Sequence, residues 1–308
     1  MSWPPLRFSI QIPSAPDLAA WTAMVQRAEG HGFSSVSVPD HLGPSLPQFA
    51  PLVALSAAAA VTSRLRLAVT VLDNDFRHPV MLAKEIATLD RLSGGRVDMG
   101  LGAGWLEEDY TKTGITTWDA PGVRVDRLIE SIELLRALFS GEPVSFRGKH
   151  YEVDDFVSFP TPVQSPVPLM IGGGGKRMLQ MAAREADIVS ILVKIGDTAD
   201  RRRAAFEEQL QWIADAGGRE RADLQVGIRV LFGDVAAAGE SRRDVAERVA
   251  GFGMTPDDVL ESPFALVGDK DAIRDHVLEI HERYGISYFT VSEDLAWKVA
   301  PVVEELSN

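Results

Sequence analysis

The feature that most constrains the fold of this sequence is its alternation of short β-branched runs with longer stretches of helical periodicity. Such alternation is typical of a parallel sheet built from strand–helix units. The clearest helix is predicted over Val125–Phe139, where apolar residues recur every three or four positions, and Gly141 ends it. Eight strands are predicted: Arg7–Ile12, Ser35–Pro39, Arg66–Leu72, Arg96–Leu101, Val167–Ile171, Ile188–Leu192, Gln225–Leu231 and Ile286–Val291. Eight such units within 308 residues predict an α/β fold, a (β/α)8 TIM barrel formed as a single domain over residues 1–308.

Two segments interrupt this alternation. Val144–Phe159 alternates and turns at Arg147-Gly148-Lys149, which predicts a hairpin inserted between the fourth and fifth units. Gly251–Phe264 has no clear period and predicts a second, irregular insertion. Because the sequence contains no repeat, low-complexity tract or flexible linker, we expect both insertions to pack on the barrel at its C-terminal mouth.

Charge and cysteine content exclude several classes of protein. A net charge of −13 disfavours nucleic acid and anionic membranes as partners, and the Arg201–Arg203 run is offset by Glu207 and Glu208 one turn further on. The sequence has no cysteine, and its six histidines show no ligand spacing, so we expect no metal. No targeting or membrane segment is recognisable, which predicts a cytoplasmic protein. Abundant arginine and alanine suggest a GC-rich genome, as in actinobacteria.

The active site of a (β/α)8 barrel is built from the loops that follow the strands. Asp40-His41 follows the second strand, and a carboxylate beside an imidazole can tune the histidine to titrate near neutral pH. A helix-capping Asp beside a surface His would give the same pair. Arg77-His78, after the third strand, could likewise bind an anion or serve only the fold.

Two glycine-rich loops follow the fourth and fifth strands. In Gly100–Trp105 the small residues allow the backbone to lie against a flat ligand, with Trp105 as an apolar wall; a turn at a crowded rim is the alternative. Gly172–Arg177 predicts a phosphate site, because its glycines expose backbone amides at a helix start beside Lys176 and Arg177. It is neither a Walker loop nor a dinucleotide fingerprint, and a flexible turn is the competing interpretation.

In this order and spacing the motifs resemble the luciferase-like monooxygenase superfamily, and within it the branch that depends on coenzyme F420, a deazaflavin. The resemblance runs along nearly the whole chain. It is carried by Ala28–Phe33, Asp40-His41, Arg77–Pro79, Ala87–Arg96, Gly102–Trp105, Gly148–Tyr151 and Gly172–Lys176.

The resemblance implies a barrel whose mouth holds the deazaflavin ring, and it implies roles for individual residues. Asp40 and His41 would line the ring, with His41 transferring a proton. Thr70-Val71 would support the back of the ring, often through a non-prolyl cis peptide. The other implied cofactor contacts are Asp73, Ala103, Gly104 and Glu108, with Gly172, Gly173, Gly174, Gly175, Lys176 and Arg177 around the phosphate.

The substrate pocket is predicted to be lined by Trp105, Leu192 and Phe264. Relatives that oxidise sugar phosphates carry a carboxylate at the position of Trp105, so the sequence favours a small, more apolar organic substrate. The leading hypothesis is therefore hydride transfer between coenzyme F420 and such a substrate. An FMN-dependent monooxygenase and a non-catalytic flavin or deazaflavin carrier are the alternatives. Relatives are commonly homodimers, and we expect the same assembly here.

Overall fold

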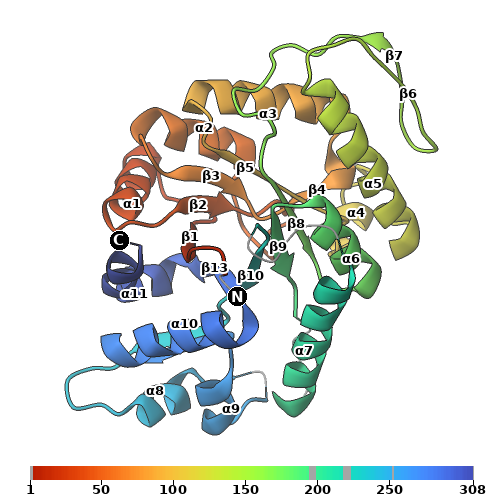
Figure 1. Cartoon of the computed structure of the whole chain (residues 1–308). Coiled ribbons are helices and arrows are strands. Elements are labelled where there is room, and N and C mark those ends of the chain that lie inside the picture. Colours follow the sequence, from red (N-terminus) through yellow and green to blue (C-terminus); the bar gives the residue numbers. More distant parts are fainter. Residues whose placement is uncertain (1–2, 194–198, 218–222, 252, 308) are drawn as a thin grey trace. The chain divides into compact units, whose positions relative to one another are not determined.

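The computed structural model describes residues 3–193, 199–217, 223–251 and 253–307, and in these residues strands and helices alternate as predicted (Figure 1). Eight of the strands are parallel and have the order β3-β2-β1-β13-β10-β9-β8-β5, with β3 also paired to β5. This is the strand order of a (β/α)8 barrel, so the predicted fold class is confirmed. The barrel strands are β1 (Arg7–Gln11), β2 (Ser35–Val38), β3 (Arg66–Val69), β5 (Val97–Gly102), β8 (Leu169–Gly173), β9 (Ile188–Ile191), β10 (Gln225–Arg229) and β13 (Ile286–Ser292).

By its internal packing the chain divides into two compact units, which are described separately below. Unit 1 contains residues 1–12, 27–35 and 172–308, and unit 2 contains residues 13–26 and 36–171. The organisation as one domain stays a prediction. None of the described helices combines the length and the apolar composition needed to cross a membrane.

Unit 2 holds the strand ends that the sequence marked with Asp40, Asp73 and Gly104. Its third barrel strand is divided, because the chain turns at Thr70-Val71 and continues as the short β4 (Leu72–Asp73), which pairs with β5. The helices of this unit that the structure describes are α2 (Pro51–Val61), α3 (Pro79–Ser93), α4 (Glu107–Thr111) and α5 (Pro121–Leu138), with a short 3-10 turn, η1 (Asn74–Phe76).

Helix α3 shows how local sequence sets an element of unit 2. It begins at Pro79, whose fixed φ suits a first helical position, and the His78 ring accepts a hydrogen bond from the Val80 amide. It ends at Gly94, which adopts the left-handed conformation and returns its amide to the carbonyls of the last turn. The apolar stripe between them is buried against β5, α2 and α5.

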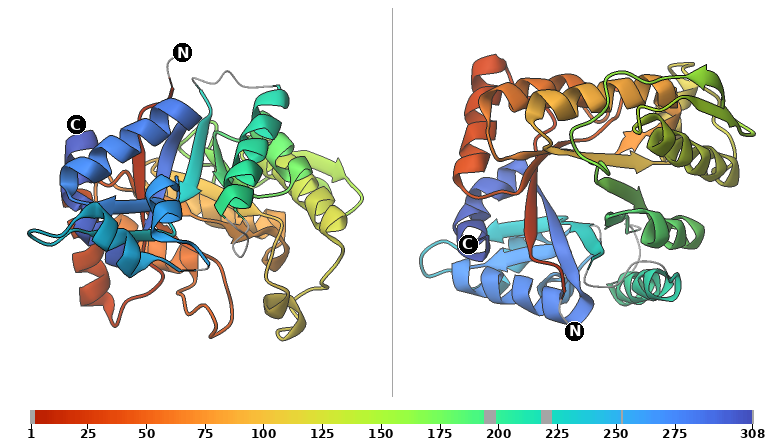
Figure 2. Two further views of the ribbon diagram at one scale, coloured as in Figure 1. Left: turned by 90° about the horizontal axis from the view of Figure 1, so that it is seen from below. Right: turned by 45° about the horizontal axis from the view of Figure 1, so that its top comes forward.

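The predicted hairpin is present as β6 (Val144–Arg147) and β7 (Glu152–Phe156), and it lies beside α5 (Figures 1 and 2). Glu130 of α5 holds its turn, since the carboxylate accepts hydrogen bonds from the amides of Lys149, His150 and Tyr151. Although burial opposes ionisation, these amide bonds outweigh it and lower the pKa of Glu130.

Unit 1 contains β1, β13, β10 and β9, which form adjacent parallel strands. Its helices α10 (Lys270–Tyr284) and α11 (Glu293–Leu306) contact β13, and α6 (Lys176–Glu185) packs on β9 and on α7 (Ala199–Asp215). The first helix, α1 (Leu18–Gly30), is shared between the two units.

The second insertion is more regular than the sequence predicts. After β10 the chain forms β11 (Phe232–Val235), α8 (Arg242–Val249), α9 (Pro256–Glu261) and β12 (Ala265–Gly268), and β11 pairs with β12 in parallel (Figure 1). A small apolar core buries Phe232, Val245, Val259 and Val267 between them. The two helices begin with capping boxes at Ser241 and Thr255, a signal that the irregular hydrophobic pattern concealed.

Candidate functional site

Asp40, which follows β2, is a buried carboxylate that binds Arg77. The Arg77 guanidinium donates to both Asp40 oxygens, at 2.6 and 3.1 Å, and the Asp73 amide donates to one of them at 3.1 Å. Asp40 is 5% exposed, so removing either partner would leave a buried charge without compensation. Arg77 therefore serves the site by fixing Asp40, in agreement with the structural interpretation of Arg77-His78.

His41 is oriented by Asp109 of α4 and not by its neighbour Asp40. Nδ1 of His41 lies 2.8 Å from Oδ2 of Asp109, and the other Asp109 oxygen accepts from the Leu42 amide at 3.1 Å. The predicted pairing of Asp40 with the His41 imidazole is wrong, because Nδ1 of His41 contacts Asp109, and both Asp40 oxygens are bound by Arg77 and the Asp73 amide. An ionised Asp109 selects the tautomer with the proton on Nδ1, which leaves Nε2 as a proton acceptor.

Trp105 lies at the edge of the His41 ring. The two rings are perpendicular, with centroids 5.2 Å apart, and Trp105 is 59% exposed. An exposed indole beside a partly buried imidazole that pairs with a buried carboxylate gives the strand end an apolar surface next to a proton-transfer group. This position agrees with the predicted role of Trp105 in a substrate pocket, which stays a prediction.

Asp73, at the end of β4, is the carboxyl group with the most altered acidity in unit 2. Burial raises its pKa to about 6, while hydrogen bonds from the Tyr110 hydroxyl and the Asp75 amide partly oppose the rise. The Tyr110 hydroxyl lies 2.7 Å from both Asp73 oxygens. Burial and the Asp73 carboxylate raise the pKa of Tyr110, so the hydroxyl remains the donor. A carboxyl group that titrates near neutrality can accept or release a proton during turnover.

The contact between Asp73 and Tyr110 requires a glycine at position 104. Gly104 has φ +75°, and a Cβ at this position would lie 2.0 Å from the Tyr110 hydroxyl and 2.7 Å from an Asp73 oxygen. The neighbouring carbonyl of Ala103 accepts a hydrogen bond from buried Arg124 at 2.9 Å. The loop after β5 is therefore fixed from behind by Arg124, and its glycine makes room for Tyr110 on Asp73.

The peptide bond between Thr70 and Val71 is cis, which confirms the expectation drawn from the family resemblance. Gly100 of β5 accommodates the chain there, because a Cβ on Gly100 would lie only 1.8 Å from the Val69 carbonyl oxygen. Glu108, in contrast, is engaged by a surface ion pair with Lys112 at 2.6 Å. Its predicted role toward a cofactor stays a prediction.

The glycine-rich loop Gly172–Gly175 belongs to unit 1, between β8 and α6. The amide of Leu192 donates to the Gly173 carbonyl at 2.8 Å, and the Gln209 side chain of α7 donates to the carbonyls of Gly174 and Leu192 at 2.9 and 3.2 Å. The loop is therefore fixed by hydrogen bonds to the end of β9 and to α7, and it is not a flexible turn.

Two of these glycines are needed by the fold itself. A Cβ on Gly174 would lie 2.4 Å from the Leu192 carbonyl oxygen, and one on Gly173 would lie 2.4 Å from the Met178 side chain. The sequence alone predicts that substitution of Gly173 or Gly174 weakens cofactor binding far more than it lowers thermal stability. For Gly174 this expectation is wrong, because the clash is with backbone that cannot move aside.

Gly175, the N-cap of α6, differs from Gly173 and Gly174 because the fold leaves space for a side chain there. A Cβ there would meet no atom within 4 Å, and no side chain caps the helix. The start of α6 thus has no side-chain cap, and the side chains of Lys176 and Arg177 beside it are exposed. Amides at a helix N-terminus next to two cations are suited to binding a phosphate.

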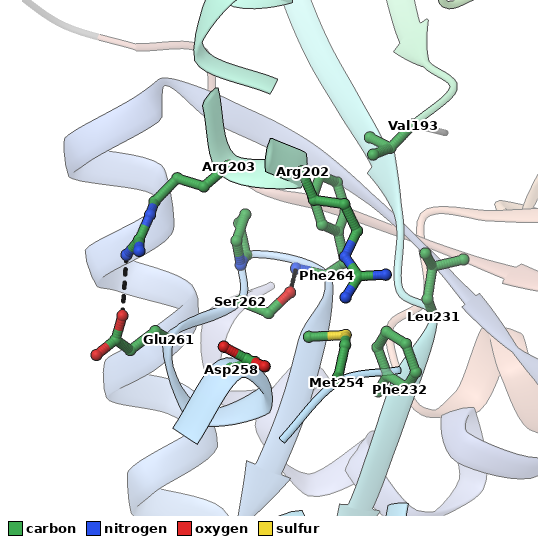
Figure 3. A pocket seen from close by; sticks show the side chains of 11 residues that line it. Val193, Arg202, Arg203, Leu231, Phe232, Met254, Asp258, Glu261, Ser262 and Phe264 are labelled. Atoms are coloured by element: carbon green, nitrogen blue, oxygen red, sulfur yellow. Dashed lines mark hydrogen bonds and ion pairs between the residues drawn. The ribbon is translucent and has the colours of Figure 1, made fainter. Parts of the chain in front are cut away.

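Phe264 is buried against Phe206, with ring centroids 4.9 Å apart, and it lines a small cavity within unit 1 (Figure 3). This cavity has a volume of about 40 Å³, enough for a few water molecules. Met254 and Phe232 form other parts of its wall, and Arg202 reaches it from α7 (Figure 3). Leu192 is 54% exposed at the end of β9. The roles of Leu192 and Phe264 toward a substrate stay predictions.

Within unit 2 the structure brings Asp40, Asp73 and Gly104 into one network, and it places His41 against Trp105. Sequence reasoning missed Asp109 and Tyr110. Both lie on the short helix α4, whose contacts with His41 and Asp73 join residues 68 and 37 positions apart. No periodicity or spacing in the sequence signals such contacts.

Known proteins resemble this chain in sequence and in fold. Over 186 residues it is 36% identical to an uncharacterized protein of Mycobacterium tuberculosis, a match that covers 54% of this chain and 64% of that protein. Over 198 residues it is 35% identical to the F420-dependent glucose-6-phosphate dehydrogenase of Nakamurella multipartita, covering 61% and 56%. The matches thus span less than two thirds of the length of these relatives.

Among solved structures, the coenzyme F420-dependent tetrahydromethanopterin reductase of Methanopyrus kandleri superposes with a TM-score of 0.75. The alignment covers 99% of this chain and 98% of the reductase at 19% identity, which supports the fold. Residues 4–238 match the family described as luciferase-like monooxygenase. This match covers most of the chain and confirms both the resemblance and the expectation of an enzyme. The chain belongs to the luciferase-like monooxygenase family.

Proposed function

We propose that the chain is a coenzyme F420-dependent oxidoreductase that transfers hydride between the deazaflavin and a small organic substrate. The observation that carries the proposal is the His41–Asp109 pair, which presents Nε2 as a proton acceptor beside exposed Trp105 at a barrel strand end. Relatives named as F420-dependent dehydrogenases, at 35% and 32% identity, support the choice of cofactor.

The glycine-rich loop has the donors that the phosphate of such a cofactor requires. Open space at Gly175, uncapped amides at the start of α6 and the cations of Lys176 and Arg177 would hold it. FMN also carries a phosphate, so this loop fits both the proposed cofactor and the FMN of a monooxygenase. When bound, reduced coenzyme F420 supplies the hydride.

The side chains of unit 2 would transfer protons and hold the site residues in position. His41 would give or take a proton at Nε2, while Asp109 holds its ring and stabilises the imidazolium. Asp73, with a pKa of about 6, is a second group that can change protonation near neutral pH. The Arg77–Asp40 pair would keep the end of β2 in place.

Titration of the protein with coenzyme F420 and with FMN, followed by fluorescence, tests the cofactor. The proposal expects tighter binding of coenzyme F420 and oxidation of its reduced form by an organic acceptor under nitrogen. Preferential binding of FMN with oxygen consumption would support a monooxygenase. Binding of reduced coenzyme F420 without oxidation by any acceptor in a broad panel would support a carrier.

The proposal includes a substrate that is small and largely apolar, because Trp105 offers an exposed indole next to His41. It also includes action in the cytoplasm and a homodimeric assembly, as the family resemblance implies. The names of the F420-dependent relatives give a sugar phosphate as the substrate. Sugar phosphates are disfavoured here, because the family resemblance implies a carboxylate at the position of Trp105 in enzymes that oxidise them.

A further inference from the structure

Arg229 ends strand β10 on a polar face of unit 1. Side chains alternate along a strand, so Arg229 shares a face with Gly227 and Gln225. Gln225 on this face accepts a hydrogen bond from Arg7 at 2.9 Å, and a Cβ on Gly227 would lie 3.1 Å from Tyr288 of β13.

The opposite face of the same strands is apolar. Ile228 is buried, as are Phe8 of β1 and Phe289 of β13, whose rings stack with centroids 5.5 Å apart. In a (β/α)8 barrel the apolar outer face packs against the helices, and the other face points into the barrel. Arg229 is thus the last inward-facing residue at the C-terminal end of β10, where barrel enzymes bind their substrates.

The side chain of Arg229 makes no hydrogen bond or ion pair with any residue in the described part of the chain, and the residue is exposed. Burial by surrounding protein atoms nevertheless lowers its pKa, and no carboxylate offsets the effect. The side chain is thus surrounded by protein atoms and is still reached by solvent. Arg203 and Arg243 on the outer surface of unit 1, in contrast, each bind a carboxylate.

The position of Arg229 separates it from the phosphate loop. Ile228 of β10 is in register with Ile191 of β9, and Leu192, the next residue, donates its amide to Gly173 at the end of β8. Neighbouring strands are spaced by about 4.8 Å, so β10 lies about 10 Å from β8. The cofactor phosphate has its own donors at α6, which leaves Arg229 for a different anion.

We propose that Arg229 binds an anionic group of the substrate, a carboxylate or a phosphate, at the mouth end of β10. A guanidinium forms paired hydrogen bonds to either anion and is worth most where water is partly excluded. The inference rests on the proposed function and narrows its substrate: a largely apolar molecule that carries one anionic group.

The test compares the wild type, Arg229→Met and Arg243→Met. Methionine keeps an unbranched apolar side chain at position 229, and Arg243→Met is the control for loss of a positive charge elsewhere on unit 1. Binding of coenzyme F420 is measured first by fluorescence. Benzoate and benzyl alcohol, which share a ring and differ in charge, are then titrated by calorimetry into protein with and without the cofactor.

We expect all three proteins to bind coenzyme F420 within a factor of two of one another. Benzoate should bind Arg229→Met at least tenfold more weakly than the wild type and the control, with benzyl alcohol unchanged. Equal benzoate binding by all three proteins, or none by the wild type, overturns the inference. A tenfold loss of coenzyme F420 binding in Arg229→Met would assign Arg229 to the cofactor and also overturn it. If no protein binds coenzyme F420, the proposed function fails, and the benzoate comparison without cofactor still tests Arg229.

Discussion

Replacing Asp73 by Asn should stabilise the protein relative to the wild type, by an amount that increases as the pH rises. The pKa of this carboxyl is raised from 3.8 to about 6 because the folded protein buries it. The folded state therefore holds the proton more tightly than the unfolded chain does. Stability from this group is fully present below about pH 4, falls as the pH rises toward 6 and stays lower above it.

The size of this effect follows from the difference between the two pKa values. At about 1.4 kcal/mol per pKa unit, the raised pKa of Asp73 lowers the free energy of unfolding by about 3 kcal/mol at pH 8 and by about 1.5 kcal/mol at pH 5, relative to a group that does not ionise. Asn cannot ionise, so Asp73→Asn escapes this cost. Its weaker hydrogen bonding to Tyr110 costs about 1 kcal/mol, but by the same amount at every pH.

Urea unfolding followed by tryptophan fluorescence at pH 5, 6, 7 and 8 measures the effect. The difference in free energy of unfolding between Asp73→Asn and the wild type should increase by about 1.5 kcal/mol from pH 5 to pH 8. Asp154→Asn, at an exposed position of the hairpin, is the control and should run parallel to the wild type. Parallel curves for Asp73→Asn as well would refute the claim that burial raises the pKa of Asp73.

Other variants test the site and the assembly. His41→Ala should lower turnover by roughly a hundredfold, the usual scale of acid–base assistance, and leave coenzyme F420 affinity within twofold; unchanged turnover would remove His41 from the chemistry. Asp109→Asn should shift the pH profile of turnover, whereas a merely structural role would change only the melting temperature. Gly175→Val should weaken cofactor binding at nearly constant melting temperature, and Gly174→Ala should lower the melting temperature even without cofactor; the reverse pattern would contradict the assigned contacts. Light scattering should give about twice the monomer mass of 33.5 kDa, and a monomer at micromolar concentration would rule out the dimer.

The barrel could be predicted from sequence because its strands are short apolar runs that hydrophobic periodicity detects directly. Predicted and observed strands differ by a few residues at their ends. The larger differences have local causes. Helix α5 begins at Pro121 and not at Val125, since its first turn carries buried Arg124 where an apolar stripe would be expected. The third barrel strand ends early because the chain turns at Thr70-Val71.

The candidate site was only partly predictable for a different reason. Its strand-end residues, such as Asp40 and His41, follow recognisable strands, but their partners come from elsewhere in the chain. Adjacency in sequence predicts that Asp40 pairs with His41, whereas in the fold Asp40 pairs with Arg77 and His41 pairs with Asp109. Pairings of this kind depend on where α4 packs, which no local pattern encodes.

Gln209 of α7 helps to hold the glycine-rich loop in place from outside the loop itself. Its single amide nitrogen holds the ends of two strands together, through the carbonyls of Gly174 and Leu192. A glutamate of the same shape has an oxygen there, cannot donate when ionised and would repel both carbonyls. One nitrogen atom on α7 thus helps to hold the loop in place. Substitution of Gln209 could therefore change the proposed binding of the cofactor phosphate without altering any residue of the glycine-rich loop.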